Sequence, residues 1–155
     1  MALNREVIGR VYDPGPPFDV SRQKIREFAS AIGDDERWYH DIEFARAAGH
    51  PDIPAPPTFA YVPALLMGQG PRTDPDVGID YSRIVHGEQR IDFNRPIYAG
   101  DVLAGAVTLE DIRDAGGNEL IEILCVLSDS DGEEVCRVTS LLVSRGTGAG
   151  NQSAA

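Results

Sequence analysis

The fold of this chain is decided by the stretch F-A-Y-V-P-A-L-L-M-G, residues 59–68. The stretch is apolar on every side of a helix, and a helix of that kind belongs inside a protein. With Thr58 as the N-cap, Pro63 falls just beyond the first turn, where it removes one backbone hydrogen bond. The stretch therefore predicts a buried central helix with a kink at Pro63.

The residues after this helix are typical of strands. Residues 68–78 contain many Gly, Pro and Asp residues, so we expect a loop there. Alternating apolar residues and Gly-bearing turns then predict four strands, at residues 84–94, 102–111, 119–127 and 135–144. The third contains the run L-I-E-I-L-C-V-L, which suits a central strand that is buried on both faces. The short turns predict an antiparallel meander.

The residues before the helix predict one short strand and two helices. The strand is expected around residues 7–12, and the run D-P-G-P-P after it predicts a loop. The first helix begins after Ser21, ends near Gly33 and buries the face that carries Ile25, Phe28, Ala29 and Ile32. The second helix spans residues 42–48, with Asp41 as its N-cap and Gly49 as its stop.

This element order predicts an α+β fold with a five-stranded antiparallel sheet wrapped around a central apolar helix. The two earlier helices form a helical overhang beside that sheet. We expect a single domain over residues 1–145. Residues 146–155, G-T-G-A-G-N-Q-S-A-A, have nothing to bury and are expected to be a disordered tail.

The composition excludes several classes of function. A chain of 155 residues, 42% hydrophobic and 25% charged, fits one globular domain. The net charge of −11 argues against binding to nucleic acid or to an anionic membrane, which both require cationic surface. No apolar run reaches the roughly 20 residues of a membrane span, and the first ten residues carry charges where a signal peptide is apolar. We therefore expect a soluble, cytoplasmic protein.

No metal or cofactor is expected. His40, His50 and His86 lack the spacing of metal ligands, and the sequence contains no phosphate-binding or dinucleotide-binding fingerprint. Cys125 and Cys136 lie in apolar surroundings and are interpreted as core residues.

The overhang carries the segment I-G-D-D-E-R-W-Y-H-D-I-E-F-A, residues 32–45. It resembles the active-site segment of MaoC-like acyl hydratases, which runs roughly S-G-D-x-N-P-x-H-x-D-x-x-F-A. Five residues match that pattern: Gly33, Asp34, Asp41, Phe44 and Ala45. The Asn, Pro and His positions of the pattern instead hold Glu36, Arg37 and Tyr39.

Four further blocks extend this resemblance over the chain up to about residue 145. They are V-S-R-Q-K-I-R-E-F-A at 20–29, G-H-P-D-I-P-A-P-P-T-F at 49–59, D-Y-S-R-I-V-H-G-E-Q at 80–89 and R-P-I-Y-A-G-D at 95–101. Together they resemble the MaoC-type (FAS1-like) dehydratase N-terminal domain family, which implies a hot-dog fold. The chain is most similar to the A-type or C-type subunits of heterodimeric (3R)-hydroxyacyl-acyl carrier protein dehydratases.

The resemblance implies that catalysis needs a second chain. Hydration of an enoyl thioester requires a base of near-neutral pKa, which His provides. A tyrosine, with an ordinary pKa of about 10, is a poor base at Tyr39, and Asp34 then lacks its usual partner. In such pairs the A-type subunit shapes the pocket for the acyl chain, and a catalytic hot-dog subunit supplies Asp and His. The substrate implied is an acyl thioester of acyl carrier protein or coenzyme A.

Two alternatives remain at this point. The chain can be a self-sufficient homodimeric hydratase or thioesterase that uses Asp34 with His40 or His86. It can also be a module that binds an acyl or steroid thioester without turnover. Each candidate residue also has a structural interpretation: Asp34 as a turn residue, Tyr39 as a packing residue and His86 as a satisfied strand histidine. For the acyl chain we expect contacts with residues of the central helix and its approach: Pro57, Thr58, Phe59, Tyr61 and Leu65.

Overall fold

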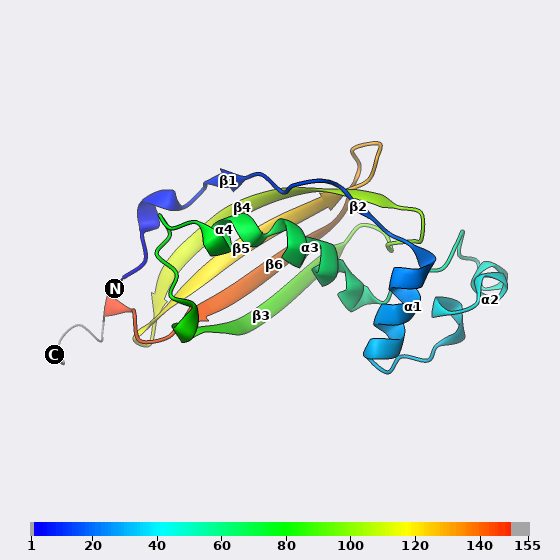
Figure 1. Ribbon diagram of the computed structural model, residues 1–155, viewed down its shortest axis with the longest axis horizontal. Helices are drawn as coiled ribbons and strands as arrows, with labels where there is room; N and C mark the ends of the chain where they lie inside the picture. Colours follow the sequence, from blue (N-terminus) through cyan, green and yellow to red (C-terminus); the bar gives the residue numbers. More distant parts are fainter. Residues whose placement is uncertain (1, 150–155) are drawn as a thin grey trace.

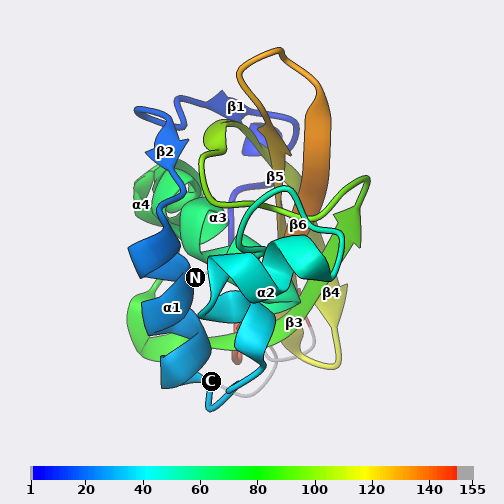
Figure 2. The same cartoon turned by 90° about the vertical axis from the view of Figure 1, so that its right-hand side faces the viewer.

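The computed structural model describes residues 2–149 and shows a curved antiparallel sheet with helices on one face (Figure 1). Two helices, α3 and α4, lie along that face, while α1 and α2 extend beyond one end of the sheet. In the view turned by 90°, α1 and α2 are nearest the viewer, in front of the end of the sheet (Figure 2). The predicted α+β fold, with a sheet around a central helix and a helical overhang, is confirmed.

The sheet is built on five strands in the order β1-β4-β5-β6-β3, and β2 pairs with the start of β4. Their bounds are β1 Val11–Tyr12, β2 Phe18–Asp19, β3 Ile84–Phe93, β4 Val102–Ala115, β5 Asn118–Ser128 and β6 Glu134–Ser144. The four long strands match the prediction, but the meander is limited to β4, β5 and β6. β3 pairs with β6, the last strand. The segment between β3 and β4 therefore crosses from one side of the sheet to the other, and it is not the hairpin turn that was predicted.

The central helix begins later than predicted. A 3₁₀ turn, η3 Pro57–Ala60, precedes the α-helix α3 Tyr61–Met67, and Thr58 does not cap it. Pro63 is thus the third residue of α3, in the first turn, where a backbone N–H has no helical partner to lose. The 3₁₀ turn replaces the expected kink.

The central helix is buried on the face that meets the sheet. Ala60, Ala64 and Met67 are buried, whereas Leu66 is 60% exposed. The prediction that this helix is buried on every side was therefore wrong. Met67 packs on Gly105 of β4, where an added Cβ would lie 2.5 Å from the Met67 sulfur. A side chain at position 105 would therefore require the Met67 side chain to move.

A short helix, α4 Gln69–Thr73, occupies residues that were predicted to form a loop. Its Pro71 stands in the first turn, where proline is tolerated. The side chains of Gln69, Arg72 and Thr73 donate hydrogen bonds to the carbonyl oxygens four residues earlier. These bonds stabilise a turn that composition alone does not predict.

β5 is central, but it is buried on one face only. Its inner residues Ile121, Ile123, Cys125 and Leu127 are buried under the helices, and the residues between them are half-buried on the outer face. The continuous apolar run had predicted burial on both faces. Burial raises the pKa of Cys125 to about 11 and that of Cys136 to about 12, which agrees with inert core thiols.

The overhang helices begin as predicted. In α1 Arg22–Ala31 the Ser21 hydroxyl accepts a hydrogen bond from the Lys24 N–H. In α2 Ile42–Ala47 the Asp41 carboxylate accepts from the N–H groups of Glu43 and Phe44. Ile32 is 49% exposed and does not join the buried face of α1, because the helix has already ended.

Three 3₁₀ turns besides η3 complete the described chain: η1 Arg5–Val7, η2 Arg37–Tyr39 and η4 Tyr81–Arg83.

Residues 146–149, assigned above to the tail, hydrogen bond to the β4–β5 hairpin: Gly146 N–H donates to Asn118 Oδ1 and Ala149 N–H to Asp114 Oδ1. Residues 150–155 lie outside the described residues. Within residues 2–149 no helix is long and apolar enough to cross a membrane.

Candidate active site

The segment between α1 and α2 holds Asp34 as a turn residue. Its carboxylate accepts a hydrogen bond from the Glu36 N–H at 3.2 Å, and its own N–H donates to the Ala29 carbonyl at 2.9 Å. The imidazole Nε2 of His40 lies 3.3 Å from the main-chain oxygen of Asp34, not from its carboxylate. The geometry therefore forms no carboxylate–imidazole pair from these two residues.

Tyr39, at the position where the resembled hydratases have histidine, is a packed residue. It belongs to η2, is only 9% exposed, and meets Trp38 edge-to-face with 6.1 Å between ring centroids. The main chain of the neighbouring His40 is fixed by a hydrogen bond, because Arg26 Nε donates to the His40 carbonyl at 3.0 Å. This side of the overhang is thus built by packing.

A third histidine, His50, joins the overhang to the rest of the molecule. Gly49, with φ of +95°, turns the chain after α2 so that the His50 ring lies 6.4 Å from that of Trp38. On its other side, His50 Nδ1 is 3.3 Å from the phenolic oxygen of Tyr98. Neither His50 nor Tyr98 was predicted as a site residue, because no spacing pattern brings residues 48 positions apart together.

His86 lies on β3 and belongs to a separate contact. Its ring meets Tyr61 of α3 edge-to-face, with 5.6 Å between centroids, and its side chain is exposed at the sheet edge. Among the described residues, no hydrogen bond joins His86 to the overhang. The structure brings together Tyr39, Trp38, His50 and Tyr98, and leaves His86 with Tyr61.

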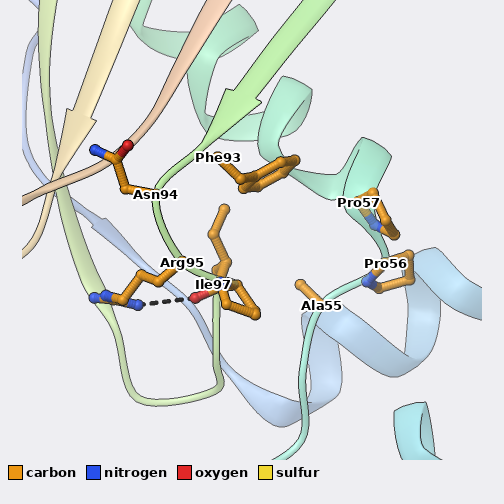
Figure 3. Close-up of a pocket in the computed structure, with 8 residues that line it drawn as sticks. Ala55, Pro56, Pro57, Phe93, Asn94, Arg95 and Ile97 are labelled. Atoms are coloured by element: carbon orange, nitrogen blue, oxygen red, sulfur yellow. Dashed lines mark hydrogen bonds between the residues drawn. The ribbon is translucent and has the colours of Figure 1, made fainter.

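A hollow of about 340 Å³ opens between the proline-rich approach to α3 and the end of β3 (Figure 3). Phe93 faces Pro56 and Pro57 across it. Main-chain bonds from Ala55 N–H to Ile97 O, at 2.8 Å, and from Ala99 N–H to Ile53 O, at 2.9 Å, hold its two sides together. The residues that line it are Ala55, Pro56, Pro57, Phe93, Asn94, Arg95, Pro96 and Ile97.

The polar side chains of this hollow are already engaged. Arg95 donates to both oxygens of Asp101, at 2.8 and 3.1 Å, and to Asp129 at 3.0 Å. The hydrogen bond to Asp101 contributes most to raising the pKa of Arg95. Asn94 Nδ2 donates to the Glu134 carbonyl at 3.0 Å. The surface of the hollow that is left for a ligand is therefore mostly apolar.

The five residues predicted to contact an acyl chain do not line a single hollow. Pro57 lines the hollow just described, whereas Phe59 lines a second hollow of about 490 Å³ between α1 and α3, together with Phe28 and Leu66. Thr58, Tyr61 and Leu65 line neither. Phe93 and Ile97, which complete the first hollow, were not predicted, because their position depends on the pairing of residues 53–55 with 97–99.

The chain matches proteins of one family along most of its length. Residues 6–138 match the model of the FAS1-like dehydratase domain region. A UPF0336 protein of Saccharopolyspora erythraea is 45% identical over 147 residues, which are 95% of this chain and 94% of that protein.

Two solved structures share the fold closely. A MaoC-like dehydratase superposes with a TM-score of 0.81 at 31% identity; the alignment covers 93% of this chain but only 43% of that longer chain. The HadBC (3R-hydroxyacyl-ACP dehydratase) complex from Mycobacterium tuberculosis superposes with a TM-score of 0.77 at 26% identity, covering 88% of this chain and 96% of that one. The expected hot-dog fold is confirmed.

Proposed function

The chain belongs to the FAS1-like dehydratase domain family, and on that premise we propose that it is the pocket-shaping subunit of a (3R)-hydroxyacyl thioester dehydratase. A partner hot-dog subunit supplies the catalytic Asp and His. The observation that carries this proposal is Tyr39: at the histidine position of the family motif stands a buried tyrosine packed on Trp38. A phenol can donate a hydrogen bond, but it is a poor substitute for the imidazole that serves as the base.

The hollow beside β3 supports a role in holding the acyl chain. A dehydratase must stabilise an enolate-like oxyanion with hydrogen-bond donors aimed at it. Pro56, Pro57 and Pro96 contribute no N–H to the hollow, and Asn94 and Arg95 donate to protein oxygens. Such a wall suits an alkyl chain and offers little to a developing charge.

The free edge of β3 supports a partner at this place. β3 pairs with β6 on one side and, among the described strands, with none on the other. Val85, at 40% exposure, and Phe93, at 39%, lie on this strand. An unpaired edge readily accepts another strand. Because Phe93 also lines the hollow, a partner that extends the sheet here would stand beside the acyl site.

The hydration of a trans-2-enoyl thioester tests this proposal. The chain is assayed alone and then with a hot-dog protein that retains the G-D-x-N-P-x-H segment, with the acyl group on coenzyme A or on acyl carrier protein. We expect turnover only with the partner, and we expect His40→Ala and His86→Ala to leave that turnover unchanged. Robust turnover by the chain alone, lost in either histidine variant, would overturn the proposal in favour of a self-sufficient hydratase.

A further inference from the structure

The outer face of the sheet, opposite α3 and α4, has more apolar side chains than a solvated face requires. In an antiparallel sheet with one covered face, residues on the other face are normally polar. On β5 the outer residues include Leu120, Leu124 and Val126, and on β6 they include Leu141 and Val143. No described helix covers this face, as both views show (Figure 1, Figure 2).

The strand register brings these side chains into one band. Leu120 pairs with Val143, and Val143 pairs with Val85 of β3, so the three form a row across the sheet. Leu141 and Leu124 follow in the next two rows. We call the six residues the outer band: Val85, Leu120, Leu124, Val126, Leu141 and Val143. It explains the continuous apolar run of β5, of which the helices bury only half.

Charges of both signs lie beside the outer band, although the whole chain carries −11. A hollow of about 160 Å³ lies among Glu88, Arg90, Arg113, Glu122, Thr139 and Leu141. Two acids and two arginines line this hollow. Both arginines also have partners in the same chain: Arg113 pairs with Asp111 at 2.8 Å and Glu122 at 3.2 Å, and Arg90 pairs with Asp92 at 2.9 Å. Nucleic acid or an anionic membrane would require a cationic face. A copy of the same face supplies both signs of charge.

We propose that the outer band stacks against the outer band of a second copy of this chain, sheet on sheet, about a two-fold axis. Such a contact is self-complementary, so each arginine can approach an acid of the other copy. Four strands of about ten residues, spaced about 4.8 Å apart, form a face of roughly 600 Å², which approaches the area of a standard interface. The contact leaves the free edge of β3 open, so it goes beyond the proposed function and does not depend on it.

Sedimentation of the purified chain and of two outer-face variants tests this inference. Leu141→Arg and Thr139→Arg each place a cation at the centre of the face. Leu66→Arg is the matched control, because Leu66 is 60% exposed on α3, away from the outer face. We expect wild type and Leu66→Arg to have the same mass, and the two outer-face variants to have half of it, with unchanged circular dichroism.

A wild-type chain that sediments as a monomer would overturn the inference. So would an outer-face variant that keeps both its fold and the wild-type mass, because the assembly would then use another surface, such as the β3 edge. If Leu141→Arg fails to fold, Thr139→Arg decides the question. Thr139 carries a hydroxyl and is half-buried, so an arginine there should disturb the fold less. Hydration with the partner subunit is measured on the same variants, and its failure with wild type would concern the proposed function alone.

Discussion

His50 and Tyr98 connect the overhang to the segment between β3 and β4 through a contact of 3.3 Å between Nδ1 and the phenolic oxygen. His50 follows α2 and carries Trp38 on its other face. Tyr98 is bridged to Pro54 in the wall that leads to the hollow beside β3. This pair is therefore one of the contacts that hold the overhang beside that hollow.

Tyr98→Phe should loosen the overhang while keeping the ring contact with His50. Loss of one hydrogen bond of this kind costs about 1 kcal/mol in the free energy of unfolding. We expect faster amide hydrogen exchange in residues 34–50. Tyr12→Phe is the control, because Tyr12 donates to Asp74 at 2.9 Å from β1, which lies apart from α1 and α2 (Figure 1). Equal exchange of residues 34–50 in both variants would show that the His50 contact does not hold the overhang.

Tyr39 should matter for packing and not through its hydroxyl. Tyr39→Ala empties a buried aromatic site and should lower the free energy of unfolding by about 3 kcal/mol in urea titrations. Tyr39→Phe keeps the ring, so the partner-dependent hydration rate should remain within about twofold of wild type. A stable Tyr39→Phe protein that loses the activity of the complex would show that the phenol takes part in the chemistry.

The sequence predicts elements that depend on local signals. Ser21 and Asp41 cap the overhang helices as expected, since a capping side chain bonds to N–H groups two or three residues away. The four long strands were found in the same way, from alternation and turns. The missed helix α4 depends on side-chain bonds such as Arg72 to Gly68 O, and no rule of composition reveals them.

Long-range pairing is what the sequence could not provide. β3 follows the central helix in the chain but pairs with β6, about 50 residues later. The hollow beside β3 has the same origin, because Ile97 meets Ala55 only through the pairing of two irregular segments. The motif around Asp34 and Tyr39 was recognisable in the sequence, whereas the contact of His50 with Tyr98 required the fold.

Gly105→Ala should destabilise the core by overpacking. The new Cβ would lie 2.5 Å from the Met67 sulfur, so α3 or the Met67 side chain must shift. Overpacking of this kind costs about 1–3 kcal/mol. Ala106→Ser, on the opposite face of the same strand, is the control and should stay close to wild type in thermal unfolding. Combining Gly105→Ala with Met67→Ala should give less destabilisation than the sum of the two variants; strict additivity would contradict the proposed clash.

The ion pair between Arg22 and Asp52 should make the free energy of unfolding depend on pH in the acidic range. Arg22 donates two hydrogen bonds to Asp52, at 2.9 and 2.8 Å, and with the N–H of Ile53 they lower the pKa of Asp52 to about 2. A carboxyl whose pKa is depressed by folding stabilises the protein above its unfolded pKa, about 3.9, and loses this contribution as pH falls through its folded pKa.

Arg22→Gln should therefore lower the free energy of unfolding modestly at neutral pH, because the arginine is exposed and solvent screens its pair with Asp52. The difference from wild type should shrink as pH falls from about 4 to about 2, measured by urea unfolding at each pH. Arg83→Gln is the control: its exposed pair with Asp80, at 3.4 Å, lies in η4, and that variant should change stability little. A difference for Arg22→Gln that stays constant down to pH 2 would mean that Arg22 acts through packing and not through the charge of Asp52.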